Sequence, residues 1–184
     1  MKLFIFLADG FEEIEAIAPA DVFRRAGIDV VTVSVTGNLI VEGAHGIVVC
    51  ADEDFTQMQA ADFAGDALLY LPGGMPGTSN LDKSEKLKNL IMSAYTNKQV
   101  IAAICAAPLI LGKMGLLRGK KAVCYPGYET FLEGAEIPAD ETIVQADNVL
   151  TAKAAGVAIP FALKIIEIVK CKDIADKVKA DIFY

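Results

Sequence analysis

Histidine and paired cysteines are almost missing from this chain of 184 residues. His45 is the only histidine, and the four cysteines show no CxxC pairing. Zinc sites are built from clustered histidine, cysteine and carboxylate ligands. A single histidine and unpaired cysteines therefore do not indicate a zinc site. We therefore predict no metal site. The cysteines are Cys50, Cys105, Cys124 and Cys171.

The chain is also short of positive charge. It has 17 lysines and arginines against 24 aspartates and glutamates, which gives a formal net charge of −7. Nucleic acids and anionic membranes are bound through clustered lysine and arginine, so neither is expected as the main partner.

Long hydrophobic runs are missing as well. The longest uninterrupted apolar stretch, residues 100–111, is too short to span a bilayer. The start, MKLFIFLADGFEE, becomes acidic before an export signal could be completed. The sequence has no linker, internal repeat or low-complexity segment. We expect one cytoplasmic domain spanning residues 1–184, whose 54% hydrophobic content suits a sheet covered on both faces.

Strand-like and helix-like segments alternate along the chain, which predicts an α/β fold with a doubly wound, mostly parallel sheet. Ligands bind such sheets at the carboxyl ends of the strands. Asp9 is expected to cap the first helix, with Glu12 completing a capping box. Residues 37–54 predict a small hairpin and a return strand. Other strands are expected at 2–7, 29–35, 67–74, 100–104, 121–126 and, as a pair, 142–152, and helices at 11–25, 84–96, 106–114, 156–170 and 172–180.

The segment QVIAAICAAPLI places Cys105 between a β-branched apolar run and a helix-forming run with Pro108 in its first turn. One interpretation is that Cys105 is a buried small hydrophobe, as unpaired cysteines commonly are. The other is a reactive thiol at a strand-to-helix corner. The free N–H groups of the following helix favour a thiolate there and can hold an oxyanion. We favour the second interpretation because of the corner.

Three glutamates, Glu12, Glu13 and Glu15, begin the first helix. Acidic residues in a first turn complement the helix dipole, which is sufficient to explain Glu12 and Glu13. Glu15 shares its helix face with small apolar residues, so its carboxyl should be desolvated and favour the neutral form. Next to Cys105, it would donate a hydrogen bond to the thiolate and act as a general acid or base. Pro19 lacks the N–H that would bond the Glu15 carbonyl.

The segment LPGGMPG, residues 71–77, is rich in glycine and proline but lacks the spacing of a phosphate-binding loop. It is either an ordinary tight turn or a turn that serves the Cys105 thiol. In the second case, backbone N–H groups of Gly73 and Gly74 approach the thiol and complete an oxyanion site with Ala106.

Four motifs, GFEEIEA, DVFRRAGI, LPGG and AAICAAP, occur in an order that resembles the ThiJ/PfpI superfamily, specifically the branch of the Parkinsonism-associated protein deglycase and YajL. The resemblance covers nearly the whole chain. It implies a flavodoxin-like α/β sandwich of the class I glutamine amidotransferase type, and a homodimer. It also implies a nucleophile-elbow cysteine at Cys105, with Glu15 as its protonated partner and Gly74 with Ala106 as oxyanion donors.

The resemblance extends to positions around the site. Cys50 matches a family cysteine at the dimer interface, and Arg25 matches an interface arginine near the active site. Tyr125 stands where the family has a histidine near the cysteine, and His45 lies where relatives often have arginine. His45 either reaches the partner's pocket or serves packing or the surface. The segment TAKAAGV, residues 151–157, replaces the family's usual arginine-glycine-proline-glycine loop.

Several activities are implied by the resemblance, and we favour a cofactor-independent cysteine enzyme of the glyoxalase III or deglycase type. It would act on small dicarbonyls or glycated substrates through a hemithioacetal on Cys105, with Glu15 as acid and base. One alternative is a redox-sensing or chaperone-like stress protein that uses oxidation of Cys105. Another is a hydrolase of reactive acyl or phosphoglycerate species. A Cys-His peptidase is excluded, because Ala106 follows the cysteine where the peptidase branch has histidine.

Overall fold

A seven-stranded sheet forms the centre of the computed structural model, which describes all 184 residues. The strand order is β5-β2-β1-β6-β7-β9-β8, and every neighbouring pair is parallel except β8 with β9. Because the chain winds outward in both directions from β1, the predicted doubly wound, mostly parallel sheet is confirmed. The strands are β1 Lys2–Leu7, β2 Asp29–Ser34, β5 Glu53–Asp54, β6 Ala67–Leu71, β7 Val100–Ile104, β8 Ile143–Ala146 and β9 Val149–Ala152.

The central strands are almost continuously apolar because helices cover both of their faces. Successive side chains of a strand point to opposite faces. In β1, Phe4 and Phe6 therefore enter one hydrophobic core, while Leu3 and Ile5 enter the other. The sheet separates these two cores.

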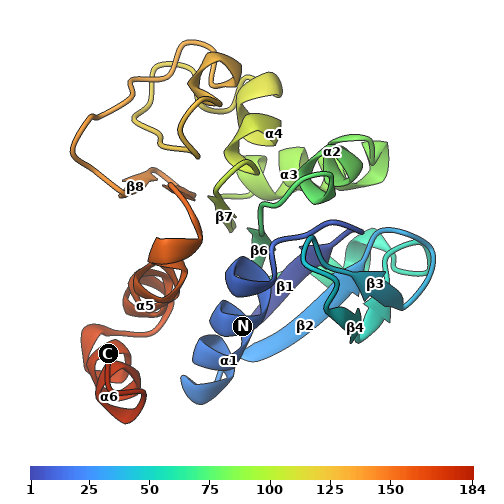
Figure 1. Cartoon of the computed structure of the whole chain (residues 1–184), viewed down its shortest axis with the longest axis horizontal. Coiled ribbons are helices and arrows are strands. Elements are labelled where there is room, and N and C mark those ends of the chain that lie inside the picture. The colour runs from blue at the N-terminus through green and yellow to red at the C-terminus, as the bar shows by residue number, and fades with distance from the viewer.

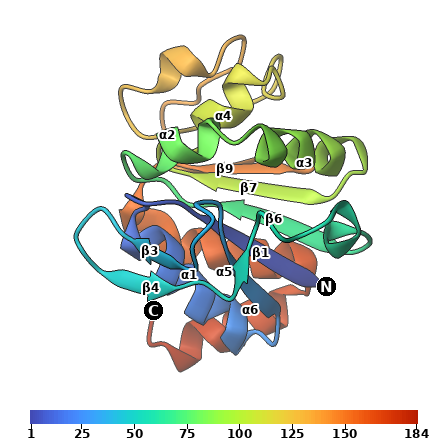
Figure 2. The ribbon, with the colours of Figure 1, turned by 90° about the vertical axis from the view of Figure 1, so that its right-hand side faces the viewer.

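Helices α1 (Glu13–Arg25), α5 (Ala158–Val169) and α6 (Lys172–Asp181) lie together on one face of the sheet, as Figures 1 and 2 show. The opposite face is covered by α2 (Gly77–Asp82), α3 (Glu85–Thr96) and α4 (Pro108–Lys113). Three short 3-10 helices, η1 Ala60–Phe63, η2 Glu129–Phe131 and η3 Ala155–Val157, lie in the connections. None of the helices combines the length and apolar character needed to cross a membrane.

The predicted hairpin is confirmed as a separate two-stranded antiparallel sheet of β3 (Ile40–Glu42) and β4 (Val48–Cys50). The short strand β5 then returns to the edge of the main sheet beside β2. The predicted pair at 142–152 is also confirmed, with a tight turn in which Asp147 has a φ of +54°.

Two local predictions are wrong. Residues 121–126 form no strand, because their N–H groups bond to scattered partners: that of Val123 donates to the Thr151 hydroxyl, and that of Tyr125 to the Cys105 carbonyl. Asp9 does not cap α1, since its carboxylate instead accepts a hydrogen bond from the N–H of Glu42 in the hairpin. Glu12 takes the N-cap position and makes no side-chain cap.

Candidate functional site

Cys105 follows β7 directly and adopts a φ of +65°, a left-handed conformation that is strained for any residue other than glycine. Hydrogen bonds fix its backbone on both sides. Its N–H donates to the Ala152 carbonyl at 2.9 Å, and its carbonyl accepts from the N–H of Tyr125 at 2.7 Å. The half-buried side chain contacts both hydrophobic cores. The predicted strand-to-helix corner is therefore present.

Glu15 lies in the first turn of α1, the helix that follows β1, and is fully buried. Pro19 deprives its carbonyl of the usual helical donor, and the hydroxyl of Tyr70 supplies a replacement at 2.9 Å. Tyr70 lies in β6 and is itself fully buried between the rings of Phe23 and Phe161. The backbone of Glu15 is thereby tied to the central sheet.

The Glu15 carboxyl lies against the Cys105 thiol. Its Oε2 accepts a hydrogen bond from the N–H of Gly73 at 2.9 Å, and the carboxyl is close enough to the thiol for each group to shift the pKa of the other. Its Oε1 has no hydrogen-bond partner. A Cβ added at Gly73 would lie 2.6 Å from the Cys105 Cβ and 2.7 Å from Oε2 of Glu15. Only glycine lets the two groups approach so closely.

The two groups titrate as a unit. Burial raises the pKa of Glu15 to about 7, against the opposing effect of the hydrogen bonds from Cys105 and Gly73. Burial and the charge of Glu15 raise the pKa of the Cys105 thiol, while N–H groups of Gly74 and Ala106 lower it. Since a negative charge on either group raises the pKa of the other, the pair retains at least one proton at neutral pH. When Glu15 holds that proton, the thiol no longer faces the carboxylate charge that contributes to raising its pKa.

Two backbone N–H groups face the Cys105 sulfur, those of Gly74 and Ala106. Neither donates to a backbone carbonyl elsewhere in the chain. Gly74 has a φ of +89°, and a Cβ there would lie 2.4 Å from the backbone nitrogen of Glu12. The loop that follows β6 and the corner that follows β7 thus place two free donors around one sulfur.

The remaining predicted site residues are more distant. Arg25, at the end of α1, forms an exposed ion pair with Asp21 at 2.6 Å, and Cys50 is exposed at the end of β4. Neither forms a hydrogen bond or ion pair with Cys105 or Glu15. Tyr125 is joined to the site through its backbone, and its ring is half exposed.

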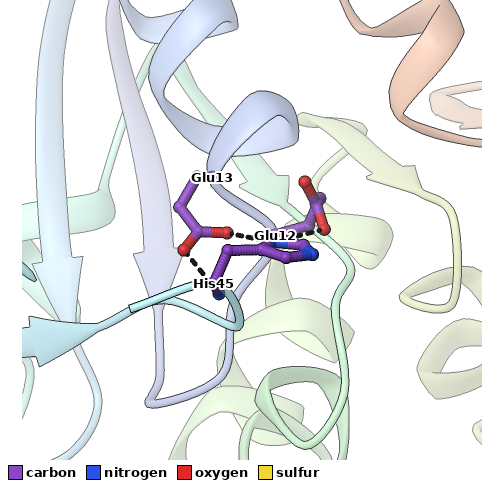
Figure 3. Close-up of side chains that lie close together, drawn as sticks. All are labelled: Glu12, Glu13 and His45. Carbon is purple, nitrogen blue, oxygen red and sulfur yellow. Dashed lines mark hydrogen bonds and ion pairs between the residues drawn. The ribbon is translucent and has the colours of Figure 1, made fainter. Parts of the chain in front are cut away.

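His45 makes a contact that sequence reasoning missed. It lies in the turn between β3 and β4, and its Nδ1 is 2.8 Å from Oε2 of Glu13 and 3.5 Å from Oε2 of Glu12 (Figure 3). Burial tends to raise the pKa of Glu13, but hydrogen bonds from His45 and Ile47 hold it below its usual value. The same contact raises the pKa of His45. The helix dipole alone therefore does not explain Glu12 and Glu13, because both also lie beside His45.

A cavity of about 750 Å³ lies away from these residues, between α3 and the segment 55–65. Its polar groups are occupied with structural contacts: the Lys86 ammonium donates to carbonyls of Phe55 and Met58, and the Gln99 amide to those of Phe63 and Gly65. It contains no cysteine, histidine or carboxylate, so the Cys105 corner remains the candidate active site.

A strained cysteine at the carboxyl end of a parallel sheet, faced by free N–H groups and a buried carboxyl, defines the class of α/β proteins with a nucleophile-elbow cysteine. The DJ-1/PfpI family model matches residues 1–168. The chain belongs to this family, and the resemblance noted from its motifs is confirmed.

Among curated relatives, Protein DJ-1 homolog A of Arabidopsis thaliana is 37% identical over 176 residues. The match covers 95% of this chain but 44% of that relative, so the chain spans less than half of its length. Glutathione-independent glyoxalase DJR-1.2 of Caenorhabditis elegans is 31% identical over 85% of this chain and 81% of its own. The crystal structure of Drosophila melanogaster DJ-1beta matches with a TM-score of 0.93 and 34% identity, over 99% of this chain and 97% of that one.

Proposed function

We propose that this protein is a cofactor-independent cysteine enzyme that converts small reactive dicarbonyls into hydroxy acids. The observation that carries the proposal is the direct contact of the buried Glu15 carboxyl with the Cys105 thiol, beside the free N–H groups of Gly74 and Ala106. The name of the Caenorhabditis elegans relative, a glutathione-independent glyoxalase, supports the same activity.

The first step joins the sulfur to the substrate. In the state in which Glu15 holds the proton, the Cys105 thiolate attacks the aldehyde carbon of methylglyoxal and forms a carbon–sulfur bond. The N–H groups of Gly74 and Ala106 stabilise the oxyanion that develops on that carbon. Glu15 then gives its proton to this oxygen, which leaves a hemithioacetal and a carboxylate.

The second step moves a hydrogen between the two substrate carbons. The Glu15 carboxylate removes the proton from the hemithioacetal carbon to give an enediolate. The resulting carboxylic acid returns that proton to the neighbouring carbon, while the hydroxyl proton of the hemithioacetal passes to the neighbouring oxygen. The product is a thioester of lactate on Cys105. Water hydrolyses this thioester, which releases lactate and restores the thiol. A carboxyl with a pKa of about 7 is suited to both transfers because it gives and takes protons near neutral pH.

We also propose that the enzyme is a homodimer joined through α1 and the hairpin. Ile14 and Ile17 of α1 are 55% and 42% exposed, and Ile47 and Val48 of the hairpin are 55% and 57% exposed. A surface hollow lined by Ile17 and Cys50 joins the two elements into one face. An exposed apolar face of this kind is typical of a protein interface. A second copy would cover this face with its own copy of the same face, as in a dimer with two-fold symmetry.

The test of the enzyme proposal is lactate formation from methylglyoxal by purified protein without added thiol. Wild-type protein and Cys171→Ser, a control that removes an exposed cysteine, are expected to form lactate. Cys105→Ser is expected to form none. If wild type forms no lactate while peroxide oxidises Cys105 selectively, the redox alternative is favoured. Hydrolysis of a reactive acyl ester without lactate formation favours the hydrolase.

A further inference from the structure

Three metal-ligating side chains converge at the start of α1, in a cluster that does not include Cys105. Figure 3 shows the carboxylates of Glu12 and Glu13 flanking the imidazole of His45, which comes from the turn between β3 and β4. One ligand atom of each residue lies within 4.8 Å of the others. The cluster thus combines the N-cap and first residues of α1 with one residue of the hairpin.

The charges in this cluster are only partly balanced. The side chains of Glu13 and Glu12 are 7% and 16% exposed. Glu13 accepts hydrogen bonds from the backbone N–H and the ring of His45, whereas the Glu12 carboxylate accepts none, since its approach to the ring at 3.5 Å is too long. A largely buried carboxylate without a donor is costly unless a cation lies beside it.

The backbone is shaped to keep this arrangement. A Cβ added at Gly43 would lie 2.3 Å from Oε1 of Glu13, so the glycine allows the carboxylate to enter the hairpin turn. The N–H of His45 donates to that oxygen at 2.7 Å. Oε1 is thus held by the hairpin, and Oε2 of Glu13 is directed at the imidazole. The hydrogen bond from the His45 N–H to Oε1 orients the carboxylate in the way that outer hydrogen bonds orient ligands in metal sites.

We propose that Glu12, Glu13 and His45 bind a divalent transition-metal ion, with Zn²⁺ as the fitting example. Bond lengths of about 2.0–2.2 Å to nitrogen and carboxylate oxygen place tetrahedral ligand atoms about 3.3 Å apart. The observed separations of 2.8 Å and 3.5 Å from Nδ1 to the two carboxylates bracket that spacing. In the single chain the His45 side chain is 68% exposed, which leaves the fourth position open to a ligand from outside the chain.

Ligand chemistry separates this site from the catalytic cysteine. It offers one imidazole nitrogen and two carboxylate oxygens but no sulfur, a set that suits Zn²⁺ or Co²⁺. A bound ion would fix the hairpin turn to the first turn of α1, the turn that also contains Glu15. This differs from the expectation of no metal site, because the sequence does not reveal that the hairpin turn folds onto α1.

Zn²⁺ and Co²⁺ binding to the full chain tests the proposal. The Zn²⁺ affinity is measured by competition with a chromophoric chelator for wild type, Cys105→Ser, Glu12→Gln, His45→Asn and the control Glu42→Gln. Glu42 is a nearby exposed carboxylate of the hairpin that lies outside the cluster. Circular dichroism and thermal melting of each variant establish that it is folded.

We expect one ion per chain in wild type, Cys105→Ser and Glu42→Gln, and at least tenfold weaker binding in Glu12→Gln and His45→Asn. The Co²⁺ complex should show visible d–d bands without the intense near-ultraviolet band of a thiolate ligand. Binding that persists in His45→Asn and Glu12→Gln would overturn the proposal, as would binding lost only in Cys105→Ser. The absence of binding to folded wild type would overturn it equally.

Discussion

The hydroxyl of Tyr70 donates a hydrogen bond at 2.9 Å to the backbone carbonyl of Glu15, the carbonyl that Pro19 leaves without its helical donor. A proline in a helix interior normally costs stability for this reason. Here the missing donor is replaced from β6, the strand that leads into Gly73 and Gly74. One contact therefore fixes the carboxyl-bearing residue relative to the loop that supplies its other partners.

Tyr70→Phe should destabilise the protein by about 1–3 kcal/mol, because the buried Glu15 carbonyl loses its donor while the ring packing is kept. Urea unfolding measures the loss. In the background of Pro19→Ala, which restores a backbone N–H, the same substitution should cost less. Equal costs in the two backgrounds would mean that Tyr70 does not substitute for the missing helical bond.

Glu15→Gln should change how stability depends on pH. The pKa of Glu15 is raised from 4.5 in the unfolded chain to about 7 in the fold, so folding favours its protonated form. This stabilisation is complete below pH 4.5 and is lost as the pH rises through 7, a change of about 3 kcal/mol. Urea unfolding from pH 4.5 to 8 should show that loss in wild type and in Glu42→Gln, and a flatter profile in Glu15→Gln. The same pH profile in Glu15→Gln and wild type would exclude a strongly raised pKa of Glu15.

Gly73→Ala should separate the Cys105–Glu15 pair. Its Cβ has room only if the cysteine or the carboxyl moves, and a displacement of about 1 Å in an active site costs about 100-fold in rate. Lactate formation measures the effect. Gly156→Ala is the matched control, because nothing lies within 4 Å of a Cβ at that position. Similar rates for the two variants would show that the close approach is unimportant.

Val48→Lys should dissociate the proposed dimer, because it places a charge in the apolar face of α1 and the hairpin. Sedimentation velocity or light scattering measures the mass. Met92→Lys is the control, since Met92 is 42% exposed on α3, on the opposite face of the sheet. A Val48→Lys protein with the wild-type mass would place the interface elsewhere.

Local patterns predicted the sheet and the corner. The apolar strands and the proline-containing helix start locate Cys105, and the small apolar residues around Glu15 predict its desolvation. The two carboxyl ends then meet because parallel strands share an edge. The local sequence was sufficient to predict the places of Cys105 and Glu15, because each place follows from the adjoining strand or helix.

Contacts that depend on the path of a loop were not predictable in this way. Glu13 contacts His45 only because the hairpin folds back over the start of α1, and Asp9 bonds to Glu42 for the same reason. The strand expected at 121–126 has the right composition, but Thr151 and Cys105 take its backbone bonds. The contacts of Glu13, Asp9 and Val123 join residues that are 28 or more positions apart in the chain. The hydrogen bond between Tyr125 and Cys105 depends on the path of the backbone, which composition does not encode.

We propose that Glu15 transfers protons for a nucleophilic Cys105, and a paired measurement on Glu15→Gln tests this role. Lactate formation from methylglyoxal and alkylation of Cys105 are followed in the same preparation. We expect a thiol that is still alkylated but lactate formation reduced by about 100-fold or more, because glutamine cannot exchange a proton with substrate. Lactate formation at the wild-type rate would show that Glu15 transfers no proton in the reaction.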